Sequence, residues 1–167
     1  MKKTTLTIAV AVLLLICSNG ILAQTTPVTL NQVELMKQFL GTWKVELGKD
    51  TIQVTEILCF RNGGFELYSK YMYKDKIYAE HKYLCGYDKK NDKYILAVIV
   101  NDNPNIGLTT LCFTSKTTCD RIPYTYISNP EQATSKTIYE FKSPDQFIAN
   151  DIKNGKPIKT IIYNRVK

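Results

Sequence analysis

The stretch WKVELGKDTIQVTEILCF, residues 43–60, predicts two β-strands joined by a tight turn. Trp43, Val45 and Leu47 alternate with charged residues, which is the pattern of a strand with one buried face and one solvated face. Turn-forming residues follow at 48–50, and a second β-branched run begins directly after them. The stretch therefore predicts an antiparallel hairpin whose apolar face lies against a core.

The same alternation continues along the rest of the chain. Short links rich in Gly, Asn, Asp and Pro separate the runs, so consecutive strands should pair as antiparallel neighbours. So many meandering strands must either close into a barrel or fold into two sheets. We predict an all-β fold, an antiparallel up-and-down β-barrel of nine or ten strands. The predicted strands are residues 43–47, 52–60, 65–73, 77–87, 94–100, 107–113, a weak run at 118–126, 137–141, 147–151 and 158–166.

One short N-terminal helix is predicted before the first strand, over residues 31–40. Its apolar residues include Val33, Met36 and Phe39, whose spacing of three places them on one helical face. Thr29 or Asn31 would cap the start of the helix, and the glycine at 41 would end it. We expect this helix to cover one end of the barrel.

Composition limits the class of protein. The chain has 167 residues, of which 44% are hydrophobic and 22% charged, and its formal net charge is +7. These values are typical of one globular domain and exclude a disordered chain or a large multidomain enzyme. The lysines are spread singly along the polar faces of the predicted strands, so we expect a solvated surface and no nucleic-acid partner.

The N-terminus predicts export. Lys2 and Lys3 precede an uncharged run at 6–16, and cleavage after Ala23 would leave a domain at 24–167. Residues 1–23 are therefore predicted to be a signal peptide, and the mature domain to be periplasmic or secreted. The alternatives are a permanent membrane anchor, for which the run is too short, and lipid modification at Cys17.

Alternation along the strands also predicts which polar residues face inward. Continuing from Trp43 through a four-residue turn places Glu56 inside, and the strand at 65–73 adds Tyr71. The register of the strand at 77–87 is ambiguous: one register places His81 inside, and the other places Glu80 there. We favour the first. Glu56, Tyr71 and His81 would then form either a ligand pocket or a satisfied polar cluster in the barrel interior.

The irregular stretch at 119–133 interrupts the rhythm of strands and short turns. It contains Tyr124 and Tyr126 between prolines 123 and 130. If the barrel binds a ligand, these tyrosines are expected at the rim of its mouth, at the end opposite Trp43. The alternative is that both rings pack down as part of a weak strand.

A short helix that runs into Gly41-Thr42-Trp43 resembles the opening of the lipocalin and fatty-acid-binding protein (calycin) superfamily. In that superfamily the Trp closes one end of the barrel and an Arg near the end of the last strand packs over it, and Arg165 occupies the matching place. The chain is most similar to the small lipocalin-like proteins that bacteria secrete. The resemblance implies an up-and-down barrel in which Trp43 and Arg165 form the structural closure.

Two functions compete, and an enzyme is a distant third. The first is an exported lipocalin-like binding protein for a small, largely apolar or amphipathic molecule, with Glu56, Tyr71, His81, Tyr124 and Tyr126 as candidate ligand-binding residues. The alternative is a structural or protein-interaction barrel with a filled interior. No catalytic motif is present, and a single His with no neighbouring ligand set predicts neither a metal nor another cofactor. The sequence does not predict the oligomeric state.

The cysteines of an exported domain suggest disulfide bonds. Cys112 and Cys119 would lie opposite each other if residues 115 and 116 formed a two-residue turn, and we predict a disulfide between them. Cys59 and Cys85 are predicted to be free thiols, because a third strand separates their strands.

Overall fold

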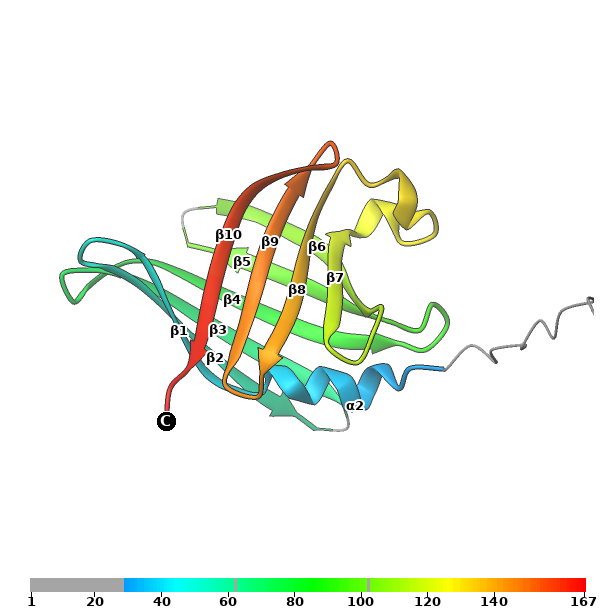
Figure 1. Cartoon of the computed structure of the whole chain (residues 1–167), viewed down its shortest axis with the longest axis horizontal. Coiled ribbons are helices and arrows are strands. Elements are labelled where there is room, and N and C mark those ends of the chain that lie inside the picture. The colour runs from blue at the N-terminus through cyan, green and yellow to red at the C-terminus, as the bar shows by residue number, and fades with distance from the viewer. Residues whose placement is uncertain (1–28, 62, 102) are drawn as a thin grey trace, which may run out of the picture.

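The strands form one closed barrel in which every neighbouring pair is antiparallel. The computed structural model describes residues 29–61, 63–101 and 103–167, so the predicted signal peptide and Cys17 lie outside the described residues. Each strand pairs with the next along the chain, and β1 pairs with β10 to close the ring (Figure 1). The predicted up-and-down barrel is therefore confirmed, with ten strands. Their bounds are β1 Gly41–Gly48, β2 Thr51–Phe60, β3 Gly64–Tyr73, β4 Lys76–Asp88, β5 Lys93–Val100, β6 Asn103–Phe113, β7 Thr118–Pro123, β8 Ser135–Ser143, β9 Gln146–Lys153 and β10 Lys156–Arg165.

The predicted helix covers one end of the barrel. It consists of α2, Gln32–Met36, continued by the 3-10 turn η1, Lys37–Phe39. Asn31 caps its start, because the Asn31 side chain accepts a hydrogen bond of 3.1 Å from the backbone N–H of Glu34. The Gln32 side chain is bonded to both backbone groups of Phe113, so the helix is fastened to β6 as well as packed on the core.

The register of β2 differs from the predicted one by one residue. Leu47 is an extra residue in β1, since the pairing shifts between Glu46 and Gly48. This bulge turns Gln53, Thr55 and Ile57 inward. Glu56 is exposed on the outer face of the barrel, so its predicted inward position is wrong.

The favoured register of β4 is the one observed. His81 pairs with Ser69, and Tyr83 pairs with Leu67, so both face the interior beside their β3 partners. The adjoining β5 continues this inner surface, because His81 and Tyr83 pair with Val100 and Val98.

The predicted irregular stretch divides into a strand and an outer covering. Residues 118–123 form β7, and the link that follows contains the 3-10 turns η2, Tyr124–Tyr126, and η3, Pro130–Gln132. This link lies outside the barrel wall beside β7 (Figure 1). Lys93 of β5 donates a 2.6 Å hydrogen bond to the Ile127 carbonyl, and η2 contacts β6. The link therefore covers the outer face of these strands, which explains why the outward-facing Thr110 and Ile122 are buried.

Candidate ligand-binding site

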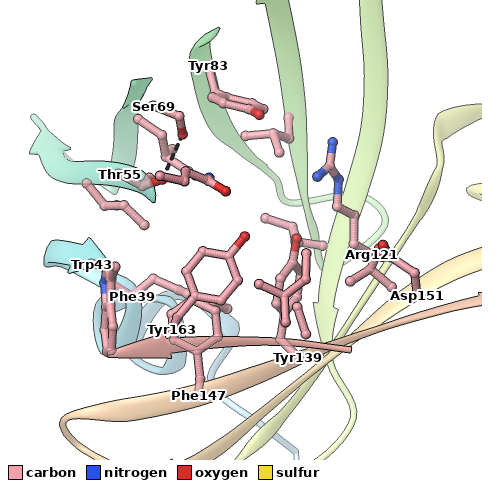
Figure 2. Close-up of a pocket in the computed structure, with 18 of the residues that line it drawn as sticks. Phe39, Trp43, Thr55, Ser69, Tyr83, Arg121, Tyr139, Phe147, Asp151 and Tyr163 are labelled. Atoms are coloured by element: carbon pink, nitrogen blue, oxygen red, sulfur yellow. Dashed lines mark hydrogen bonds between the residues drawn. The ribbon is translucent and has the colours of Figure 1, made fainter. Parts of the chain in front are cut away.

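The barrel interior contains a cavity of about 180 Å³ above the helix (Figure 2). Its floor is made of aromatic and aliphatic side chains that α2, η1 and the adjacent strand ends contribute. Trp43 lies edge-on to Phe147, with ring centres 4.6 Å apart, and Phe39 contacts Phe147 at 5.4 Å. Phe147 in turn stacks on Tyr163 at 4.4 Å. This part of the cavity favours an apolar, flat group.

One wall of the cavity is polar, and its side chains are hydrogen-bonded to one another. Gln53 donates to the Thr55 hydroxyl at 3.0 Å, and the hydroxyls of Thr55 and Ser69 are 2.8 Å apart. All three side chains are buried. In this part of β2 the polar Gln53 and Thr55 face inward and the apolar Ile52 and Val54 face outward, which is the reverse of the usual pattern.

Four tyrosines contribute hydroxyl groups to the cavity wall: Tyr71, Tyr83, Tyr139 and Tyr163. Burial raises the pKa of Tyr83 and of Tyr163 well above the ordinary value for tyrosine. Burial also raises the pKa of Tyr71. These phenols are therefore neutral at physiological pH and able to donate hydrogen bonds to a bound group.

Arg121 on β7 supplies the positive charge of the cavity. Its Nε donates a 3.0 Å hydrogen bond to the Thr109 hydroxyl. Burial lowers the pKa of the Arg121 guanidinium, but neighbouring tyrosine hydroxyls, Tyr139 foremost, raise the pKa by more, so the group stays charged. Among the residues that the structure describes, no carboxylate forms an ion pair with Arg121.

Nothing in the sequence pattern singles out Arg121 as a cavity residue. Of the adjacent residues Arg121 and Ile122, the sequence favours Ile122 as the inward-facing one, because Ile122 is apolar. The link that follows β7 buries Ile122 from outside and leaves the inner position to Arg121. Cys119 is the one clue to the inward position of Arg121. Residues two apart in a strand face the same side, and Cys119 is buried inside the barrel.

The predicted ligand-binding residues do not come together in one place. Tyr71 lines the cavity, whereas Glu56 points away from it. His81 lies beside the cavity wall, where its ring centre is 4.7 Å from that of Tyr71 and its Nδ1 is 3.1 Å from the Tyr83 hydroxyl. Tyr124 and Tyr126 are not part of the cavity lining, and their predicted place at the rim is wrong, because η2 folds against the outside of the barrel.

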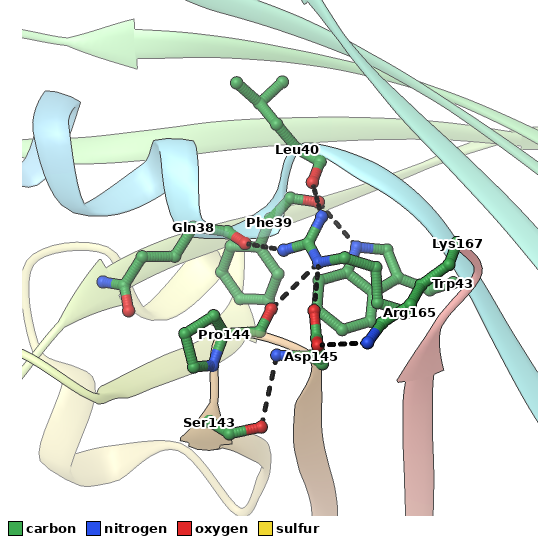
Figure 3. A network of polar contacts seen from close by, with 9 residues as sticks. All are labelled: Gln38, Phe39, Leu40, Trp43, Ser143, Pro144, Asp145, Arg165 and Lys167. Carbon is green, nitrogen blue, oxygen red and sulfur yellow. Dashed lines mark hydrogen bonds and ion pairs between the residues drawn. The ribbon is translucent and has the colours of Figure 1, made fainter.

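Trp43 and Arg165 form the closed end that the sequence motif implies (Figure 3). The guanidinium carbon of Arg165 lies 4.1 Å from the centre of the Trp43 ring. The guanidinium also donates hydrogen bonds to the carbonyls of Leu40, Gln38 and Pro144. The Trp43 indole N–H donates to the Phe39 carbonyl at 2.7 Å, so the plug is fixed to the helix on one side and to the last strand on the other.

The predicted disulfide between Cys112 and Cys119 is wrong. The turn between β6 and β7 has four residues, 114–117, so Cys119 pairs with Phe113 and Cys112 pairs with Asp120. Neighbouring residues in a strand point to opposite faces, so the two thiols lie on opposite sides of the barrel wall. Cys59 and Cys85 are unpaired as well; Cys59 is exposed and Cys85 is buried.

Comparison of the chain with protein families, with curated proteins and with solved structures finds no match. In the described part of the chain, no helix has the length and hydropathy to cross a membrane. Nor do its His, Cys, Asp and Glu side chains gather in a group of three or more able to hold a metal ion. The closed ten-stranded barrel is compatible with a calycin-like fold.

Proposed function

We propose that this protein binds one small amphipathic molecule inside its barrel, with an acidic group of the molecule at Arg121. The observation that carries this proposal is a guanidinium that lines a cavity without a carboxylate partner among the described residues. A partly buried charge that lacks a counter-charge lowers stability. A bound anion would supply that counter-charge, and the tyrosine hydroxyls beside Arg121 would donate further hydrogen bonds to it.

The size of the cavity limits the ligand. Pockets for drug-sized molecules enclose roughly 300 to 1,000 Å³. An apolar protein cavity of about 150 Å³ holds one benzene molecule. At about 180 Å³ the cavity accommodates one ring or a short chain, with the acidic group directed toward Arg121. The aromatic floor favours an apolar group at the opposite end of the ligand.

The outer surface supports the second candidate function, an interaction barrel whose interior needs no ligand. Leu84, Ala97 and Leu108 are direct cross-strand partners on the outer faces of β4, β5 and β6. The side chains of Leu84 and Leu108 are 53% and 45% exposed, and Ile99 beside them is 56% exposed. Contiguous exposed apolar side chains of this kind are typical of protein contact surfaces.

We propose binding rather than catalysis, because the sequence contains no nucleophile motif or phosphate-binding loop. We also propose export, with residues 1–23 as a signal peptide, and membership of the calycin superfamily. The residues at 1–23 support export, and the helix, Gly41, Trp43 and Arg165 support the superfamily.

Two experiments test the proposal. Native mass spectrometry of the gently purified protein should show a small mass adduct that unfolding releases. Titration of ligand-depleted protein with 3-phenylpropionate, followed by the fluorescence of Trp43, should show saturable binding that Arg121→Gln weakens about tenfold or more, the loss expected for a hydrogen-bonded charge. Arg61→Gln, which removes an exposed arginine, is the matched control and should leave binding unchanged. Equal affinities for the Arg121→Gln variant and the natural protein would contradict the proposal.

A further inference from the structure

A negative charge faces the same cavity as Arg121. Asp151 on β9 lines the cavity, and its Oδ1 accepts a 2.6 Å hydrogen bond from the Thr137 hydroxyl. Thr137 pairs with Arg121 on one side and with Asp151 on the other, so the three residues form one row across β7, β8 and β9. The row places a cation, a hydroxyl and an anion side by side on the inner surface.

Within the described residues, neither charge is neutralised. Arg121 and Asp151 do not form an ion pair with each other, and no other ion pair includes either of them. Lys159 is the direct partner of Asp151 on β10, and it too makes no ion pair. The hydrogen bond from Thr137 occupies only one of the acceptor sites of the carboxylate, which leaves the second oxygen for a donor.

The spacing of the row fits a ligand with two opposite charges. Neighbouring strands lie about 4.8 Å apart, so the backbones of β7 and β9 are separated by roughly 9.6 Å. A ligand that lies between the two side chains can direct its carboxylate to the guanidinium of Arg121 and its ammonium to the carboxylate of Asp151. A simple carboxylate bound at Arg121 would meet the like charge of Asp151, and a simple amine would meet the like charge of Arg121.

We propose that the ligand of this cavity is a zwitterion, an α-amino acid or a close relative, with its carboxylate at Arg121, its ammonium at Asp151 and an aromatic side chain on the floor that Phe39, Trp43 and Phe147 form. This inference rests on the proposed function, because it adds a second anchor to the site that Arg121 defines. The volume of about 180 Å³ suits a single ring with a short polar end. Asp151 is the residue that selects a zwitterion over a plain acid.

Asp151→Asn separates a structural role from a binding role. The asparagine side chain keeps a carbonyl oxygen that accepts the hydrogen bond from Thr137, but it loses the charge and carries an NH2 donor in place of the second oxygen. The fold should therefore survive this substitution with little change in thermal stability. Glu131→Gln, which removes an exposed carboxylate on η3, is the matched control.

Isothermal titration calorimetry of ligand-depleted protein with three matched probes tests the inference. L-phenylalanine carries both charges, 3-phenylpropionate lacks the ammonium, and 2-phenylethylamine lacks the carboxylate. Phenylalanine should bind about tenfold or more tightly than either of the others, as expected for one additional charged hydrogen bond. Asp151→Asn should remove this advantage and leave the affinity for 3-phenylpropionate equal or higher, whereas Glu131→Gln should change neither affinity.

Each remaining outcome is decisive. If 3-phenylpropionate binds as tightly as phenylalanine, or if Asp151→Asn weakens both equally, the zwitterion is overturned and the proposed anion site at Arg121 stands. If only 2-phenylethylamine binds, or if none of the three binds at millimolar concentration, both the zwitterion and the proposed function are overturned.

Discussion

Arg165 lies over the face of Trp43 at one of the two residue pairs that join β1 to β10. The same contact closes the ring of strands and seals the floor of the cavity, because the Trp43 ring lines the cavity and packs edge-on against Phe147. The stability of the barrel and the shape of the proposed site therefore depend on one packed pair.

Replacement of Trp43 tests this dependence. Trp43 is fully buried, so Trp43→Ala should lower the free energy of unfolding by about 3 to 5 kcal/mol, the usual cost of emptying a large core site. Urea unfolding followed by circular dichroism measures the loss. Because Trp43 is the only tryptophan, the native emission spectrum should be that of a buried indole. A native emission maximum equal to that of the unfolded chain would contradict the packing.

Position 41 requires a glycine for two reasons: its backbone has a positive φ, and the Arg165 side chain lies too close to leave room for a Cβ. Its φ is +112°, and a Cβ at this position would lie 2.5 Å from Nη1 of Arg165. Gly41→Ala should therefore destabilise the protein by more than about 1 kcal/mol. Gly48→Ala, where a Cβ meets nothing within 4 Å, is the control and should be close to neutral. Equal melting temperatures for the two variants would refute the explanation.

The thiols should differ in reactivity, because burial raises the pKa of Cys85 to about 12 and that of Cys119 well above its ordinary value. Cys59 is exposed. A thiolate is the reactive form, so at pH 8 an aromatic disulfide reagent should modify Cys59 rapidly and the two buried thiols only on unfolding. In protein that begins at residue 24, fewer than four reactive thiols after unfolding would reveal a disulfide and contradict the observed register of β6 and β7.

The Tyr94 hydroxyl is buried and has no hydrogen-bond partner among the described residues. Burial raises the pKa of Tyr94 from about 10 to about 12, so its contribution to stability is complete below pH 10 and is lost as the pH rises from 10 to 12. Tyr94→Phe should leave stability at pH 7 equal or higher by up to about 1 kcal/mol and reduce the alkaline loss. Tyr78→Phe, at an exposed ring, should do neither. Urea unfolding at pH 7 and at pH 11 gives both comparisons, and a variant at Tyr94 that is less stable at pH 7 would show that the hydroxyl has a partner.

Arg121 should lower the stability of the ligand-free protein, since its charge lacks a counter-ion among the described residues. Arg121→Met keeps an unbranched side chain and removes the charge, and it should raise the free energy of unfolding by about 1 kcal/mol. Binding of 3-phenylpropionate should be lost in the same variant. A loss of stability instead of a gain would assign Arg121 to the framework of the barrel, and urea unfolding of ligand-depleted protein distinguishes the two results.

The sequence predicts the barrel well because strand formation depends on local pattern. The alternation from Trp43 to Leu47 and the short turns after it determine the pairing of neighbours, and such pairing repeated along the chain has few alternatives to a closed ring. The short helix and its Asn31 cap are also local features. The bulge at Leu47 cannot be predicted in this way, because nothing in the residues at 46–48 distinguishes a residue that pairs with β2 from an extra one.

The candidate site is predicted less well, because the local pattern that predicts the strands does not show which of their faces lines a polar cavity. The cavity has polar residues such as Gln53, Thr55 and Arg121 on its inner surface, which reverses the rule that assigns apolar residues to the inside. The rule misses Arg121 because it assumes an apolar interior, and it places Glu56 inside because the bulge at Leu47 shifts the register by one residue. Tyr71 was placed correctly, because β3 follows its turn without a bulge before Tyr71.

The short seam between β1 and β10 also has a consequence for how the chain folds. Among the strands that the structure describes, every other pairing joins consecutive strands across a short link or, for β7 and β8, a somewhat longer one. Such hairpins form quickly, whereas contacts between distant segments must first overcome the entropy of closing a long loop. Ring closure should therefore be the late and slow event in folding, and the residues that complete it are also those that seal the cavity floor. The proposed binding site would then exist only after the last step of folding, so no partly folded form of this protein could hold the proposed ligand.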